Sequence, residues 1–115
     1  MTLVLPAALD LVLVVVFAAL GRRSHAEGLD LAGVGSTAWT FLVGTVTGWA
    51  LAAGVLHSPP RTLAFGAVVV ASTVVVGMVL RVVTGQGTAW SFVLVATLVL
   101  SALLLGWRLV AEWVR

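Results

Sequence analysis

The chain contains no cysteine and no lysine, and it has few charges of either sign. Its 115 residues include six basic and four acidic side chains, which is 9% of the chain. The absence of cysteine excludes disulfides and thiolate chemistry. The arginines form no basic stripe, so the small positive excess does not indicate nucleic acid as a partner.

Long apolar runs fill most of the chain, and 62% of its residues are hydrophobic. Each run is close to the roughly 20 residues that a helix needs to cross a hydrocarbon core of about 30 Å. None alternates with a period of two, and an α-helix satisfies its own backbone hydrogen bonds in lipid. We therefore expect one membrane domain, residues 1–115, with helices at about 3–20, 38–56, 63–83 and 89–110.

The connections predict an all-α integral membrane fold, a four-transmembrane-helix up-down bundle with short hairpin turns. The stretch 57–61 contains two prolines, which disfavour helix before them and suit the first turn of the next helix. The stretch 84–88 contains two glycines, which can adopt positive φ. Residues 21–37 form the main polar loop of this prediction. From these four spans we expect a multi-pass protein of the cell (plasma) membrane.

The arginines do not orient the bundle. Counting the expected spans assigns three arginines to each side of the bilayer, so the positive-inside rule gives no preference. A single orientation and a mixed one that permits an antiparallel dimer both stay open. Because one short chain encloses little, we expect a homo-oligomer in the lipid bilayer.

Tryptophans mark the span ends, with one exception. Trp39, Trp90, Trp107 and Trp113 fall near the expected helix ends, as an interfacial aromatic belt requires. Trp49 lies about two turns inside the second helix. It is interpreted either as a packing or lipid-contacting ring or as a ring that faces a ligand.

Small residues recur every four positions along the second helix, and such a stripe lets another helix backbone approach closely. The partner can be a helix of this chain or a second subunit. The packing stripe consists of Ser36, Thr40, Gly44, Gly48 and Ala52.

Asp10 is a carboxylate inside the first apolar run, where an ionisable group is costly and marks a candidate functional site. Its expected partner is Arg108, because both fall toward the same side of the membrane, and Glu112 lies one turn beyond Arg108. Three readings stay open for Asp10: a structural ion pair, a proton- or ion-coupling group, and a tolerated side chain that reaches the interface.

Weakly polar helix faces and a second group of arginines complete the candidate sites. Thr97 and Ser101 share a face of the fourth helix with Arg108 and Glu112; Thr73, Gly77, Arg81 and Thr84 form a similar stripe on the third. These faces either line a narrow aqueous path or only hold helices together. Arg22, Arg23 and Arg81 are candidates for binding an anion or a lipid headgroup, with interfacial anchoring as the alternative.

His25 and Glu27 have the spacing of some zinc ligands. His57, however, falls at the other membrane face, so one chain does not supply three ligands, and we expect no metal and no cofactor. Paired carboxylates in one pocket and a nucleophile with an adjacent base are both missing. This argues against an enzyme.

Several segments together resemble an uncharacterised family of small four-span prokaryotic membrane proteins, the DUF3054 family of actinobacteria and haloarchaea. The resemblance runs through Asp10, residues 21–28, residues 80–81, residues 84–92 and residues 106–108. It brings no known activity. It implies a set of residues to test first: Asp10, Arg22, Arg23, His25, Glu27, Arg81, Ser91 and Arg108.

Two function classes remain. The first is a small oligomeric transporter or channel with Asp10 as its intramembrane coupling or ion-pair residue. The second is a non-transporting membrane scaffold or accessory subunit that recruits a membrane or cytoplasmic protein partner through residues 21–35.

Overall fold

The computed structural model describes residues 4–24, 31–85 and 90–114. Within these residues the chain is helical, with no strand. The helices are α1 (Val4–Ser24), α2 (Leu31–Trp49), α3 (Leu63–Val83) and α4 (Trp90–Trp113), and a π-helical segment, η1 (Ala50–Val55), continues α2. The chain therefore has the expected all-α fold.

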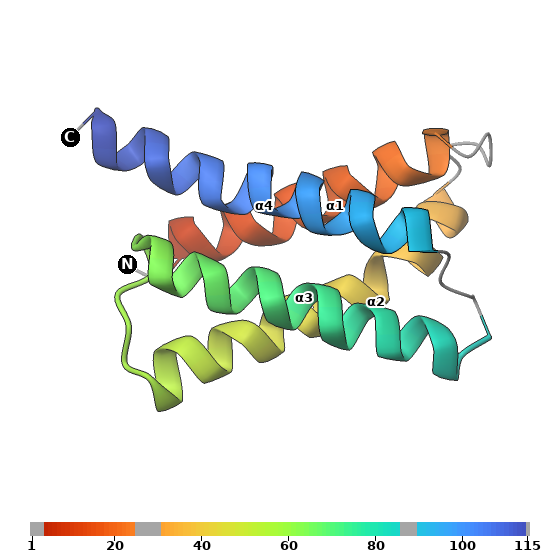
Figure 1. Cartoon of the computed structure of the whole chain (residues 1–115), viewed down its shortest axis with the longest axis horizontal. Coiled ribbons are helices and arrows are strands. Elements are labelled where there is room, and N and C mark those ends of the chain that lie inside the picture. The colour runs from red at the N-terminus through yellow and green to blue at the C-terminus, as the bar shows by residue number, and fades with distance from the viewer. Residues whose placement is uncertain (1–3, 25–30, 86–89, 115) are drawn as a thin grey trace.

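Consecutive helices run antiparallel and form an up-down bundle (Figure 1). Both chain ends and the α2–α3 turn lie at one end of this bundle, which we call the terminal end. Of the neighbouring pairs, α2 and α3 share the most extensive contact, whereas α1 and α4 share the least. The bundle is 39 Å long, enough to cross a hydrocarbon core of about 30 Å.

Three helical segments of the described chain are long and apolar enough to cross a membrane: Gly35–Val55, Leu63–Val83 and Val93–Trp113. The apolar part of α1, Val4–Leu20, is shorter, although the whole helix has 21 residues. These helices fit a membrane protein by length and composition.

The first connection is shorter than the expected loop of residues 21–37, because α1 continues to Ser24 and α2 already begins at Leu31. Hydropathy locates the hydrocarbon crossing, whereas a helix can continue beyond it through residues of good helix propensity such as arginine. The α4 helix likewise extends past residue 110.

The α2–α3 turn is built from local hydrogen bonds. At the end of η1, the Leu56 N–H donates to the Leu51 carbonyl at 2.9 Å, and His57 then adopts a positive φ of 53°. Thr62 caps α3, since its hydroxyl oxygen accepts from the Phe65 N–H at 3.2 Å. This turn places Pro60 and the start of α3 at the terminal end.

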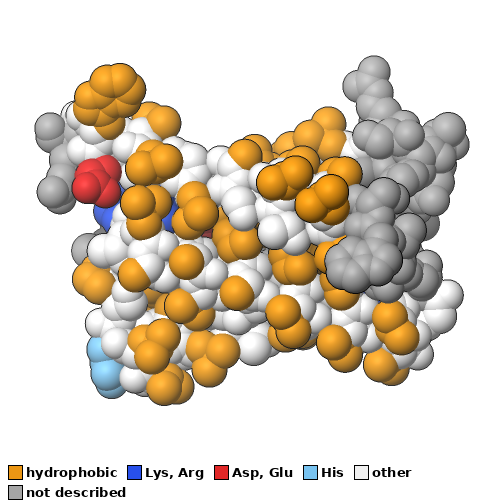
Figure 2. All heavy atoms as spheres, viewed as in Figure 1, with side chains coloured by type: hydrophobic (Ala, Val, Ile, Leu, Met, Phe, Trp, Pro, Cys, Tyr) orange, Lys and Arg blue, Asp and Glu red, His pale blue; other side chains and the backbone are white. Residues whose placement is uncertain are grey.

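Polar side chains lie inside the bundle, and apolar side chains cover much of its surface. Asp10, Thr45, Thr73 and Arg108 are fully buried, while valines and leucines of all four helices are exposed. Figure 2 shows hydrophobic side chains spread over the described face, with charged groups gathered toward the terminal end. An apolar exterior of this extent suits contact with lipid tails rather than water.

The packing stripe of α2 faces α3 of the same chain over its central part. A Cβ on Gly44 would lie 2.8 Å from the Ser72 carbonyl oxygen, and one on Gly48 would lie 2.9 Å from the Val69 Cα. The Thr45 and Thr73 hydroxyls bond to each other across this contact at 2.8 Å. Thr40 and Ala52 are buried as well, whereas Ser36 is exposed.

Replacing Gly44 with alanine is expected to destabilise the bundle, because its methyl group would meet α3 backbone that cannot move independently. Overpacking of this kind costs about 1–3 kcal/mol. The midpoint of thermal unfolding, followed by circular dichroism in detergent, should fall. Gly106→Ala is the matched control, since open space surrounds Gly106 and alanine favours helix. Equal midpoints for the two variants would contradict the assigned contact.

Candidate functional site

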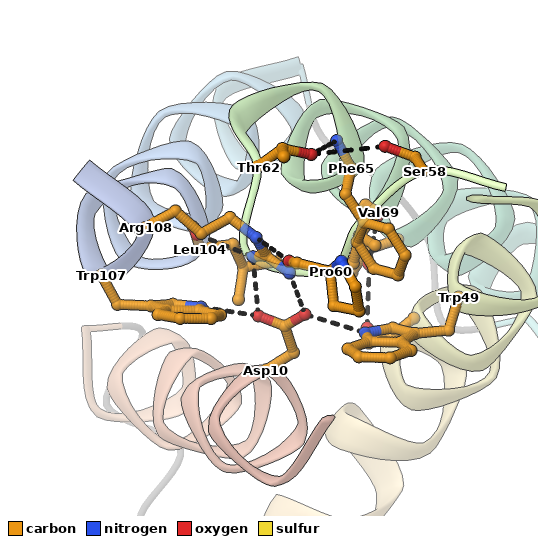
Figure 3. A network of polar contacts seen from close by, with 12 residues as sticks. Asp10, Trp49, Ser58, Pro60, Thr62, Phe65, Val69, Leu104, Trp107 and Arg108 are labelled. Atoms are coloured by element: carbon orange, nitrogen blue, oxygen red, sulfur yellow. Dashed lines mark hydrogen bonds and ion pairs between the residues drawn. The ribbon is translucent and has the colours of Figure 1, made fainter. Parts of the chain in front are cut away.

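Asp10 lies at the centre of a buried polar network near the terminal end (Figure 3). Its position in α1 is about 9 Å past Val4 by the helical rise of roughly 1.5 Å per residue. The side chain has no accessible surface. Donors from α2 and α4 surround the carboxylate, so the network joins distant parts of the sequence.

Arg108 of α4 binds Asp10 with two parallel hydrogen bonds. Its Nη1 donates to Oδ1 at 2.9 Å and its Nη2 donates to Oδ2 at 2.8 Å. The Arg108 side chain is also completely buried. The planar guanidinium matches the two carboxylate oxygens, and such bidentate pairs are stronger and more directional than single contacts.

Two indole N–H groups complete the coordination of Asp10. Trp107 donates to Oδ1 and Trp49 donates to Oδ2, both at 2.8 Å. Each carboxylate oxygen therefore accepts one bond from the guanidinium and one from a tryptophan. All four donors therefore point at acceptor oxygens of this one carboxylate.

The remaining contacts of Arg108 lead to backbone. Its Nε donates to the Pro60 carbonyl and its Nη1 to the Leu104 carbonyl, both at 2.9 Å. Gly66 of α3 makes room for this side chain, since a Cβ there would lie 2.8 Å from the Arg108 Cδ. The guanidinium thus connects α4 to the α2–α3 turn as well as to α1.

Aromatic rings enclose the guanidinium. Its Cζ lies 4.5 Å from the ring centroid of Trp107 and 5.5 Å from that of Phe65. Trp49 packs edge-to-face on Phe65, with centroids 4.6 Å apart. Cation–π attraction stabilises a charge that water does not reach.

The polar atoms of the intact network are all paired, but the network is sensitive to the loss of any one member. Every buried side-chain nitrogen and oxygen among the described residues has a hydrogen-bond partner. Removing one member of a buried ion pair leaves the other uncompensated, at a cost of about 3–5 kcal/mol.

The other candidate residues lie outside this network. Glu112 is exposed and lines a pocket at the terminal end. Arg81 is half-buried near the far end of α3. The side chains of Arg22 and Arg23, and all of His25 and Glu27, lie outside the described residues.

The hydroxyl-bearing faces do not converge on an inner path in the described part of the chain. Thr73 is buried against α2 and donates to the Val69 carbonyl at 2.7 Å. Thr97 is exposed and donates to the Val93 carbonyl at 2.9 Å. Thr97 and Ser101 line an outer groove between α3 and α4. Thr73 therefore joins helices, and Thr97 is satisfied within its own helix.

Sequence reasoning missed Trp49, Trp107 and Pro60 as parts of the site. The position of Trp107 near a helix end predicts an interfacial anchor, but its indole N–H points to Asp10. A signal did exist for Trp49, since it alone departed from the belt. The Pro60 carbonyl could not be anticipated, because every residue has a backbone carbonyl and the sequence does not indicate which one accepts a bond.

Metal binding finds no support in the described residues, among which no three His, Asp or Glu side chains form a group that could hold an ion.

Apolar helices of this length, packed around a buried ion pair, fit the class of helical membrane proteins. Comparison with family models then gives the particular family. The chain belongs to the family described as Protein of unknown function (DUF3054), whose model matches residues 7–111. Neither the comparison with curated proteins nor the comparison with solved structures gives a match.

Replacing Trp107 with phenylalanine is expected to lower the free energy of unfolding by about 1.5–3 kcal/mol, the contribution of a hydrogen bond to a charged group. Trp49→Phe should behave similarly. Trp113→Phe makes the same chemical change at a ring that is 88% exposed, and it should leave stability unchanged. Chemical unfolding in detergent measures all three, and an effect of Trp113→Phe equal to the others would contradict the assigned bonds.

Proposed function

We propose that this protein is a small transporter or channel of the plasma membrane, acting as a homo-oligomer, in which Asp10 is the coupling residue. The observation that carries the proposal is the buried carboxylate, held by a guanidinium and two indoles. Ionisable groups inside membrane proteins are expensive and commonly serve ion or proton pathways.

Arg108 acts as the internal counter-ion in this mechanism. When Asp10 takes up a proton, the attraction that holds Arg108 disappears, and a buried positive charge is left without compensation. Glu112 is the nearest alternative carboxylate on α4, since it lies one turn beyond Arg108 and faces the terminal pocket. Movement of Arg108 toward Glu112 would open the network, and its return would expel the proton.

The interface between α1 and α4 is the one that this movement would loosen. These helices share the least contact of the neighbouring pairs, and the Asp10–Arg108 pair bridges them directly. The α2–α3 contact, with its close glycine approaches, stays intact in this mechanism and supports the opening.

Proton flux into liposomes tests the proposal. Purified protein is reconstituted with an entrapped pH-sensitive dye, and dye response to an imposed pH step is compared with that of empty liposomes. Flux above the empty-liposome rate is expected for the wild type. It should be lost in the neutral double variant Asp10→Asn/Arg108→Gln, which leaves no unpaired buried charge.

A loss of flux must be distinguished from a loss of folding. The single variant Asp10→Asn is expected to unfold at a lower temperature, because Arg108 then lacks its partner, whereas the double variant should retain more stability. Light scattering on the same preparations reports the oligomer. The transporter proposal would be contradicted by a folded double variant with the proton flux of the wild type. It would also be contradicted by a wild-type flux that never exceeds that of empty liposomes.

A non-transporting scaffold or accessory subunit is the second candidate, favoured by one observation. The described network is closed on itself, and the buried threonine hydroxyls bond within the bundle. A structural ion pair fits this arrangement without any moving charge. The partner protein would then be recruited at the connection between α1 and α2.

Purification in mild detergent tests the scaffold candidate. A specific protein should co-purify with the wild type and be lost when residues 25–30 are replaced by a Gly/Ser linker of equal length. Replacing the α2–α3 turn residues Leu56 and His57 with glycine and serine is the control at the opposite end. A monodisperse protein that retains no partner counts against this candidate.

A further inference from the structure

Two hollows lie along the outer seam between α3 and α4, separate from the buried network. The end pocket has a volume of about 620 Å³ and is lined by Pro59, Arg61, Thr62, Leu63, Ala111 and Glu112. A lateral groove of about 330 Å³ lies farther along the same two helices. Neither hollow includes Asp10 or Arg108.

The end pocket and the lateral groove follow one line. On α3, Leu63 of the pocket is succeeded by Ala67 and Ala71 of the groove at intervals of four residues. On α4, Leu105 of the groove lies two turns before Glu112 of the pocket. Residues at these spacings share one helix face, so the groove leads toward the pocket.

The end pocket carries one charge of each sign. Arg61 and Glu112 are both exposed there, and the structure records no ion pair between these two described side chains. Each is placed against its helix dipole, since Arg61 precedes the start of α3 and Glu112 lies in the last turn of α4. Their positions are therefore not explained by helix stability.

The lateral groove is apolar. Alanines and valines form its α3 wall, namely Ala67, Val70, Ala71, Val74 and Val75. On the α4 wall, the Thr97 hydroxyl is already bonded to the Val93 carbonyl. In a membrane, a surface groove of this chemistry faces hydrocarbon chains.

We propose that the seam binds one glycerophospholipid with an ethanolamine headgroup. Arg61 binds the phosphate, Glu112 accepts hydrogen bonds from the ammonium, and one acyl chain lies along the lateral groove. The two opposite charges match a zwitterion. An ethanolamine ammonium can donate to Glu112, whereas choline has no N–H donor and phosphatidylglycerol has no cation. The proposal concerns the described state, in which Arg108 binds Asp10 rather than Glu112, and it does not rest on the transport mechanism.

Native mass spectrometry of the full chain in detergent tests the site, with phosphatidylethanolamine, phosphatidylcholine and phosphatidylglycerol of identical acyl chains added in turn. Phosphatidylethanolamine should bind at least about fivefold more tightly than the other two, as expected for one extra charged contact of about 1 kcal/mol. Glu112→Gln should remove that preference. Arg61→Gln should weaken binding of all three lipids.

A pair of matched variants tests the groove. Ala71→Trp fills it and should lower binding of every lipid, whereas Ala102→Trp places the same ring at an exposed α4 position that lines neither hollow and should bind as the wild type does. Equal binding of the three lipids would overturn the headgroup assignment. Unchanged binding by Ala71→Trp, or a dimer that Ala71→Trp abolishes, would assign the groove to something other than a lipid chain.

Discussion

The ion pair between Asp10 and Arg108 is the interaction on which the terminal end of the bundle depends. Through it, α1 and α4 are joined where their other contacts are few, and the Pro60 carbonyl is tied to the same guanidinium. Burying two charges is tolerable only when each polar atom finds a partner. The two indoles and the backbone carbonyls meet that requirement, so the network joins α1, α2, α4 and the α2–α3 turn.

The rest of the bundle provides the geometry that this pair needs. Gly66 leaves space for the Arg108 stem, and Gly44 and Gly48 bring α2 against α3, so that Trp49 and Phe65 meet beside the carboxylate. The exterior is apolar along most of its length; of its described charged side chains, Arg61 and Glu112 lie near the terminal end and Arg81 lies near the far end of α3. One end of the molecule therefore combines a buried charge pair with a separate charged surface pocket.

Much of the architecture could be predicted from hydropathy, turn chemistry and spacing. The α3 helix has the expected bounds, and the small residues at 44 and 48 do lie at a helix contact. The network was harder to anticipate. Asp10 and Arg108 are conspicuous in an apolar chain, but Trp107 resembled an interfacial anchor, because its ring is amphipathic and both roles are satisfied near a helix end.

The sequence by itself determined the fold class and the scarcity of charge inside the apolar runs. The reason is that the length and hydropathy of a segment are local properties, and they decide whether it is stable as a helix in lipid. Only the tertiary structure decided which donors reach Asp10, which helix receives the glycines of α2, and how the surface of α3 and α4 is hollowed. These features depend on helix rotation and crossing, which bring together residues as far apart as positions 10 and 108 and which no local pattern specifies.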